Sequence, residues 1–195
     1  MNTRVLVLTA LMVLPLPAEA QKTSSTATPK QSIEPLPDSP TPNQVPRYIQ
    51  GRVSIGDPAP GFVLDNADGS SIRLSKLKGY WVLLVFADRG HQLVSMKPIK
   101  DDMAAIGVRI VGVCHEKTSR LKTMATKDNL DYLLLGDVTG QVSAVYGLFD
   151  HDRSEIEPGF VVIDRAGVVR SAVLGQQLEA DQIASIVRLK VTGQP

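Results

Sequence analysis

The side chains best suited to redox or metal chemistry in this sequence are one cysteine and three histidines. Cys114 offers a sulfur nucleophile, and the imidazoles of His91, His115 and His151 can bind metals or transfer protons near neutral pH. Metal sites usually show close spacings such as Cys-x-x-Cys or His-x-x-x-His, which these residues lack. We therefore interpret the histidines as solvated loop residues, with a metal site as the alternative, and predict no metal and no cofactor.

Cys114 directly follows the apolar run from Val108 to Val113, which is typical of a buried strand. A lone cysteine in that place is usually a small buried hydrophobe. Because strand carboxyl ends form the ligand face of parallel sheets, an exposed redox-active thiol is the alternative. Neighbouring strand residues point to opposite faces, so we do not expect His115 to activate Cys114. With no second cysteine in the sequence, Cys114 has no partner for an intramolecular disulfide.

Ser95 stands immediately before apolar residues at helical spacing, namely Met96, Ile99, Met103 and Ile106. The pattern predicts a helix that begins near Ser95, with Pro98 inside its tolerant first turn. Serine is a favoured N-cap, and we predict that role for Ser95, with a contribution of about 1 kcal/mol to stability. A nucleophilic role for its hydroxyl is the less favoured alternative.

The sequence predicts alternating strands and helices around these residues, and these elements determine their positions. The unbroken apolar run 82–86 predicts a central strand covered on both faces. Other strands are predicted at 108–113, 132–135, 159–164 and 168–174, and other helices at 118–127 and 179–191. Short strands at 62–64 and 71–74 flank Asp68-Gly69 and predict an N-terminal β-hairpin. This order predicts an α/β fold: a central mixed sheet with helices on both faces, and a ligand site at the carboxyl ends of the central strands.

The first fifty residues predict two segments outside this domain. Residues 1–20 combine Arg4, an apolar core and the small-residue site Ala18-Glu19-Ala20, a pattern typical of a cleaved signal peptide. An uncleaved anchor is the alternative, although spanning a membrane takes about 20 apolar residues. Residues 21–50 are rich in Pro, Ser and Thr and predict a disordered linker. We therefore expect an exported protein, periplasmic or secreted, with one domain at 51–195 and no stable membrane insertion after cleavage.

The overall charge indicates no polyanionic partner. Lys and Arg total 21 against 20 Asp and Glu, which gives a net charge of +1. Such a balance provides no field that would gather nucleic acid or anionic lipid, so we predict neither as a partner. The charged run 150–155 is interpreted as a solvated loop rather than a site.

A series of short motifs resembles one known family. They are Gly56-Asp57-Pro58-Ala59-Pro60-Gly61-Phe62, Asp68-Gly69, Leu77-Lys78-Gly79, the strand 82–86, Val111-Gly112-Val113, Leu134-Leu135-Gly136-Asp137, Tyr146-Gly147, and 160–164 with Gly167. In this order they resemble alkyl hydroperoxide reductase and thiol-specific antioxidant proteins, the peroxiredoxin-like AhpC/TSA (redoxin) family of the thioredoxin superfamily. The resemblance implies a thioredoxin-like fold and thiol peroxidase or disulfide-exchange chemistry.

The same resemblance implies a catalytic cysteine where this sequence has Ser95. The family's preceding proline and threonine correspond to Asp88 and Gln92, and its thiolate-stabilising arginine corresponds to Glu157. A serine hydroxyl does not ionise near neutral pH and has no sulfenic-acid state, so it cannot replace the thiol. Related membrane-tethered thioredoxins would place Cys-x-x-Cys in the same loop, where this sequence has none, and Pro158 lies near their cis-proline position.

Two main functional hypotheses follow. The first is an exported peroxiredoxin-like oxidoreductase by descent, either inactive or dependent on Cys114 with an external thiol donor. The second is a non-enzymatic binding module that holds a peptide or partner protein in the vacated pocket around Gln92, Ser95 and Glu157. A metal-binding accessory protein is a weaker third hypothesis.

Overall fold

The computed structural model describes residues 53–193, which is all but two residues at each end of the predicted domain 51–195. The signal peptide predicted at 1–20 and the linker predicted at 21–50 lie outside the described residues and stay predictions. Within residues 53–193, no helix is both long and apolar enough to cross a membrane.

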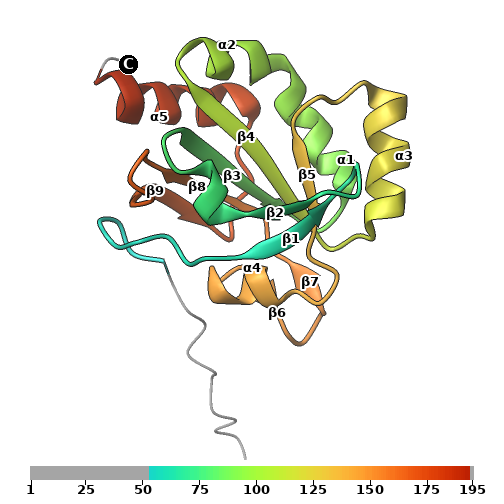
Figure 1. The fold of residues 1–195 in the computed structure, drawn as a ribbon. Coiled ribbons are helices and arrows are strands. Elements are labelled where there is room, and N and C mark those ends of the chain that lie inside the picture. Colours follow the sequence, from blue (N-terminus) through green and yellow to red (C-terminus); the bar gives the residue numbers. More distant parts are fainter. Residues whose placement is uncertain (1–52, 194–195) are drawn as a thin grey trace, which may run out of the picture. The chain divides into compact units, whose positions relative to one another are not determined.

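A seven-stranded sheet forms the centre of the fold, with its strands in the order β2-β1-β5-β4-β3-β8-β9 (Figure 1). The strand bounds are β1 Val63–Asn66, β2 Ser71–Arg73, β3 Trp81–Ala87, β4 Val108–Cys114, β5 Leu133–Gly136, β8 Gly159–Ile163 and β9 Val169–Leu174. Strands β3, β4 and β5 run parallel, whereas β1 and β8 pair antiparallel with β5 and β3. The sheet is therefore mixed, as the sequence predicted.

Strand β3 lies in the interior of the sheet, next to the middle strand β4, and both its faces and both its edges are covered. Every residue from Val82 to Ala87 is buried. One edge pairs with β4 and the other with β8. Burial on two faces explains why the run is apolar without alternation, and the prediction of a central strand at 82–86 is confirmed.

Helices cover both faces of the sheet. Their bounds are η1 Leu74–Leu77, α1 Gly90–Leu93, η2 Val94–Ile99, α2 Lys100–Ala105, α3 Thr118–Asp128, α4 Gln141–Val145 and α5 Ala180–Thr192. Elements α1, η2, α2, α3 and α5 pack on the face that carries Leu83 and Val85. On the opposite face, which carries Val82 and Leu84, pack η1, α4 and a small hairpin of β6 (Phe149–Asp150) and β7 (Glu155–Ile156). Figure 1 shows the two layers on either side of the sheet.

Two tight turns join antiparallel neighbours at the sheet edges. Strands β1 and β2 pair across Asp68-Gly69, where Gly69 has a φ of 91°. Strands β8 and β9 pair across the turn that ends at Gly167, with a φ of 89°. Glycine adopts this left-handed backbone without steric cost. The predicted N-terminal hairpin is confirmed, and β1 also joins it to the main sheet through β5.

The charged run 150–155 is not an irregular loop. Its ends form β6 and β7, and residues 151–154 make the turn between them. The Asp150 carboxylate accepts hydrogen bonds from the backbone N–H of Asp152 and Arg153, at 2.9 and 3.1 Å. The interpretation as a loop missed the hairpin because only two residues on each side form the ladder.

Candidate functional site

Ser95 does not cap a helix, which corrects the prediction from the sequence. Helix α1 begins at Gly90, and Ser95 is the second residue of the following 3-10 helix η2. Its Oγ donates a hydrogen bond to the carbonyl oxygen of Gln92 at 2.6 Å. The hydroxyl therefore satisfies a carbonyl in the preceding turn instead of accepting from backbone N–H groups.

Two residues explain why the helical segment starts earlier and why Ser95 is a poor cap. Leu93 is fully buried and extends the apolar face backwards by one turn. Pro98 occupies the third position after Ser95 and has no N–H, so it removes one of the donors that an N-cap hydroxyl satisfies. The apolar period alone did not reveal either effect.

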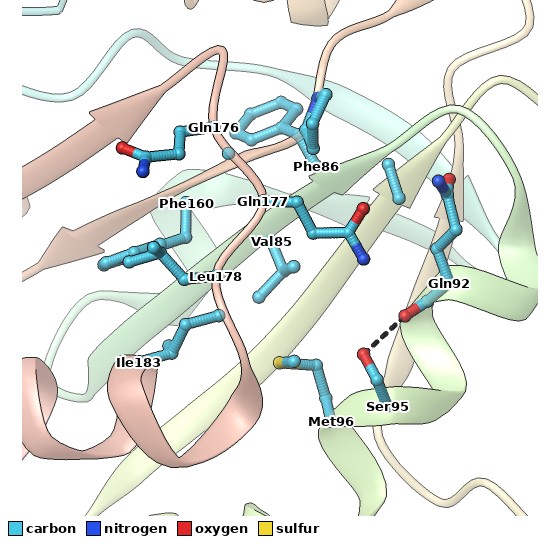
Figure 2. A pocket seen from close by; sticks show the side chains of 13 residues that line it. Val85, Phe86, Gln92, Ser95, Met96, Phe160, Gln176, Gln177, Leu178 and Ile183 are labelled. Carbon is cyan, nitrogen blue, oxygen red and sulfur yellow. Dashed lines mark hydrogen bonds between the residues drawn. The ribbon is translucent and has the colours of Figure 1, made fainter.

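A small pocket lies at the carboxyl end of β3, next to Ser95 (Figure 2). It has a volume of about 30 Å³, room for little more than water. The end of β3 and the start of β8 form one part of its wall. Gln92, Ser95 and Met96 form a second part, and the segment after β9 together with Ile183 of α5 forms the third. All of its lining residues have neutral side chains. The pocket therefore brings no charge to the place where the resemblance implies a thiolate.

Gln177 shapes this pocket, although no motif in the sequence pointed to it. Gln176, Gln177 and Leu178 line the pocket from the segment between β9 and α5. In Figure 2 the amide of Gln177 extends toward Gln92 and Ser95, whereas Gln176 points the other way. The only signal in the sequence was a short polar stretch between a strand and a helix.

Glu157 is not among the residues that line the pocket, although the next residue, Pro158, is. Its side chain is exposed, and Oε2 lies 3.1 Å from the position that a Cβ on Gly175 would take. Its backbone N–H donates to the carbonyl of Leu148 at 2.8 Å. The structure thus brings together Gln92 and Ser95 of the predicted set, and leaves Glu157 outside the lining.

Asp88, which the resemblance assigned to the position of the family's proline, ties the loop after β3 to the small hairpin. Its Oδ1 accepts a hydrogen bond from the backbone N–H of Ile156 at 3.2 Å, and its Oδ2 pairs with Arg89 Nε at 2.8 Å. The same loop is linked to α1 by a hydrogen bond that the Arg89 N–H donates to Gln92 Oε1, at 2.9 Å. Asp88 and Gln92 therefore act here as structural ties.

Glu116 is a buried carboxylate that the sequence analysis did not single out. Its Oε2 accepts a hydrogen bond from the backbone N–H of Gly90 at 3.2 Å, and Oε1 pairs with Arg120 Nε at 3.2 Å. A Cβ on Gly90 would lie 2.8 Å from Glu116 Oε2. Glu116 thus holds the first turn of α1 against the end of β4.

Cys114 is the last residue of β4 and is fully buried, as the favoured interpretation expected. Its neighbours across the sheet are Ala87 and Gly136. Burial raises the pKa of the Cys114 thiol to about 12, and the nearby carboxylate of Glu116 acts in the same direction. The thiol stays protonated near neutral pH and is not among the residues that line the pocket at Ser95.

The histidines form no metal centre within the described residues. His115 Nε2 lies 2.9 Å from the carbonyl oxygen of Val138, and Nδ1 lies 3.8 Å from Asp88 Oδ1. The ring of Phe149 contacts both His115 and His151 edge-on. In residues 53–193, no group of three or more His, Cys, Asp or Glu side chains is arranged to hold a metal ion.

Sequence comparisons relate the chain to peroxiredoxins. Residues 55–172 match the AhpC/TSA family. The chain is 30% identical over 155 residues to the chloroplastic peroxiredoxin Q of Oryza sativa subsp. japonica, which covers 75% of this chain and 70% of that protein. It is 29% identical over 103 residues to peroxiredoxin Bcp of Escherichia coli (strain K12), which covers 50% of this chain and 66% of that protein.

Solved structures agree on the fold. The crystal structure of peroxidoxin BcpB from Mycobacterium tuberculosis superimposes with a TM-score of 0.66 at 20% identity, covering 73% of this chain and 98% of that chain. The crystal structure of AhpC from Enterococcus faecalis gives a TM-score of 0.65 at 14% identity, covering 73% of this chain and 98% of that chain. The thioredoxin-like fold expected from the sequence motifs is therefore confirmed.

Proposed function

This chain belongs to the AhpC/TSA family, and from that premise we propose that it is an exported member of the family in which the thiol-peroxidase site has become inactive. The observation that carries the proposal is Ser95, whose hydroxyl is bound to the carbonyl of Gln92 at the position where the family resemblance implies a thiol. The neutral lining of the adjacent pocket supports it, since a thiolate needs positive charge or a helix N-terminus to form.

The chemistry explains why serine ends the reaction. A thiolate that attacks a peroxide takes up one oxygen as a sulfenic acid, while the other oxygen leaves as water or alcohol, and a thiol donor then restores the sulfur. Oxygen in Ser95 has no equivalent oxidised state. Because its hydroxyl is un-ionised near neutral pH, Ser95 also lacks the charge with which to attack.

A peroxidase that depends on Cys114 and an external thiol donor is the rival within the same family. The burial of Cys114 and its raised pKa argue against it, because only an accessible thiolate reacts quickly. We expect iodoacetamide to label Cys114 slowly in the native protein and quickly after unfolding in guanidinium chloride, as followed by mass spectrometry. Fast native labelling, with peroxide consumption that disappears in Cys114→Ala, would establish the rival.

A non-enzymatic binding or accessory role is the second candidate, and the amides of Gln92 and Gln177 support it. The Gln177 amide can both donate and accept hydrogen bonds, and the Gln92 amide, whose Oε1 already accepts from Arg89, can still donate, in both cases without bringing charge. With a volume of about 30 Å³, the pocket suits a small uncharged group presented by a partner protein rather than a whole peptide. Loss of partner binding in Gln177→Ala, with binding kept in Gln176→Ala, would support this role.

The deciding experiment for the main proposal measures peroxide consumption. The purified protein is given hydrogen peroxide with dithiothreitol as the thiol donor, beside the Cys114→Ala variant. We expect the two proteins to consume peroxide at the same rate as buffer with dithiothreitol alone. Multiple turnovers by the wild-type protein would contradict the proposal.

Export is tested separately. We expect the full chain, expressed in a bacterial host, to be found outside the cytoplasm with Gln21 as its first residue. A protein that keeps residues 1–20 and sediments with membranes would instead support the anchor alternative.

A further inference from the structure

A second pocket lies at the other end of the β3 and β8 pair, on the opposite face of the sheet from the pocket at Ser95. Val82, near the start of β3, pairs with Ile163, the last residue of β8, and both line it. The remaining walls come from η1, from residues 58–61 and from the turn 164–167. It shares no residue with the pocket at Ser95.

The inner walls of this pocket are apolar and belong to the core. Leu74, Leu77, Val82 and Ile163 are each at most 8% exposed. The pocket has a volume of about 230 Å³. For comparison, an engineered cavity of roughly 150 Å³ lined by similar side chains binds benzene. The space is therefore sufficient for one aromatic ring or a short alkyl chain with a small head group.

The charges at this pocket favour an anionic head group. Asp164, its one carboxylate, already accepts hydrogen bonds from the N–H groups of Ala166 and Val168 and pairs with Arg170 at 2.6 Å. Lys78 is its one cation, and no carboxylate in residues 53–193 pairs with it.

The position of the Lys78 side chain fits the same conclusion. Its Cε lies 3.4 Å from the position that a Cβ on Gly167 would take, so the side chain runs beside the turn that borders the pocket. The pocket thus combines an apolar interior, a carboxylate that is already hydrogen-bonded and, on the exposed residue Lys78, an ammonium group that no carboxylate of residues 53–193 pairs with. This combination is complementary to a small molecule with one apolar end and one carboxylate.

We propose that this pocket, formed by η1, the start of β3 and the turn 164–167, binds small amphiphilic monocarboxylates, with the apolar end between Leu77 and Ile163 and the carboxylate at Lys78. The proposal is independent of the peroxidase question, because the two pockets have no residue in common.

The test uses 3-phenylpropanoate as the probe and 3-phenylpropan-1-ol as its uncharged counterpart. Both are titrated into ¹⁵N-labelled protein, and amide chemical shifts are followed by NMR. We expect saturable shifts from the carboxylate at Gly61, Lys78 and Gly167, with the signals of Gln92 and Ser95 unchanged. The alcohol should shift the same amides but bind about threefold more weakly, because an exposed ion pair contributes only modestly.

A pair of lysine variants isolates the charge contribution. Lys78→Gln should weaken binding of 3-phenylpropanoate about threefold and leave the affinity for the alcohol unchanged. Lys76→Gln is the matched control, since Lys76 is an exposed residue of η1 that does not line the pocket. It removes the same charge and should leave both affinities as they are.

Three results would overturn the proposal. The first is the absence of saturable shifts at Gly61 and Gly167 at millimolar probe. The second is equal affinity for the carboxylate and the alcohol, which would make the pocket merely apolar. The third is an equal loss of affinity for 3-phenylpropanoate in Lys76→Gln and Lys78→Gln, which would mean that only the net charge of the protein matters.

Discussion

At the scale of single residues, the hydroxyl of Ser95 donates to the backbone of its own segment, and no basic side chain within residues 53–193 is hydrogen-bonded to it. A thiol introduced by Ser95→Cys in the Cys114→Ala background would find only neutral lining residues. We therefore expect its pKa to stay near the peptide value of about 8.5, as read from the pH dependence of iodoacetamide labelling. Peroxide consumption should barely exceed that of Ser95→Ala in the same background. A labelling midpoint below about pH 7 would reveal a stabilising group that the structure does not display.

Cys114 makes stability depend on pH in the alkaline range. The unfolded thiol ionises at about pH 8.5, whereas burial raises its folded pKa to about 12. Between these values the unfolded state has lost a proton that the folded state keeps, so stability falls as pH rises, by about 1.4 kcal/mol per pH unit.

The measurement for this prediction is urea unfolding of wild type and Cys114→Ala from pH 7 to pH 10. Cys114→Ala should lack the part of the decline that begins near pH 8.5. Burial also raises the pKa of Tyr132 and Tyr146, so these residues add their own dependence above about pH 10 and the comparison stops there. Parallel curves for the two proteins would contradict the burial of the thiol.

At the scale of elements, Asp164 holds the turn between β8 and β9. Burial alone would raise the pKa of Asp164, but hydrogen bonds from the N–H of Val168, from Arg170 and from the N–H of Ala166 outweigh it and lower the pKa. A lowered folded pKa means that the charge stabilises the fold at neutral pH, and that this contribution is lost as pH falls through the folded pKa.

We expect Asp164→Ala to lower stability at pH 7 by about 2 kcal/mol, because it leaves two turn N–H groups without their acceptor. Asp164→Asn keeps an acceptor and should cost about half as much. Urea unfolding measures both, and the difference between wild type and Asp164→Asn should shrink below about pH 4. A constant difference down to pH 2 would mean that the charge of Asp164 contributes nothing.

Alanine substitutions at two glycines separate the loss of stability caused by a left-handed backbone from the loss caused by a steric clash. Gly69 (φ 91°) has no atom within 4 Å of an added Cβ, whereas at Gly140 (φ 68°) that Cβ would lie 2.2 Å from the ring of buried Phe149. We expect Gly69→Ala to cost about 1–2 kcal/mol and Gly140→Ala about 1–3 kcal/mol more. Thermal unfolding of the two variants checks this, and equal costs would mean that the Phe149 ring moves freely.

Elements with a strong and uniform pattern could be predicted from the sequence, and those shaped by local contacts could not. The apolar run 82–86 and the polar helix at 118–127 agree with β3 and α3 to within a residue. The start of the helical segment after β3 was misplaced because Leu93 and Pro98 decide it through burial and a missing donor.

At the scale of the whole molecule, the candidate site is assembled from segments that no short motif connects. Gln92 and Ser95 were found because the family resemblance assigns roles to their positions. Gln177 was missed because only the tertiary fold brings the segment after β9 beside α1. Glu157 was assigned by counting along the chain, and its exposed side chain does not line the pocket.

The order of strands in the sheet has a consequence for how the chain folds while it is being synthesised. Strand β3 obtains one partner, β4, early in the chain, but its other partner, β8, begins only at Gly159, which is 72 residues beyond the end of β3 at Ala87. Contacts between such distant segments slow folding, since a long loop must close before they form. Until β8 has been synthesised, β3, which is almost entirely buried in the folded protein, has an open edge of the kind that pairs with other chains. A nascent chain that stopped short of Gly159 would therefore be prone to aggregate, so the segment that begins with β8, roughly the last fifth of the sequence, protects the chain by closing the edge of β3.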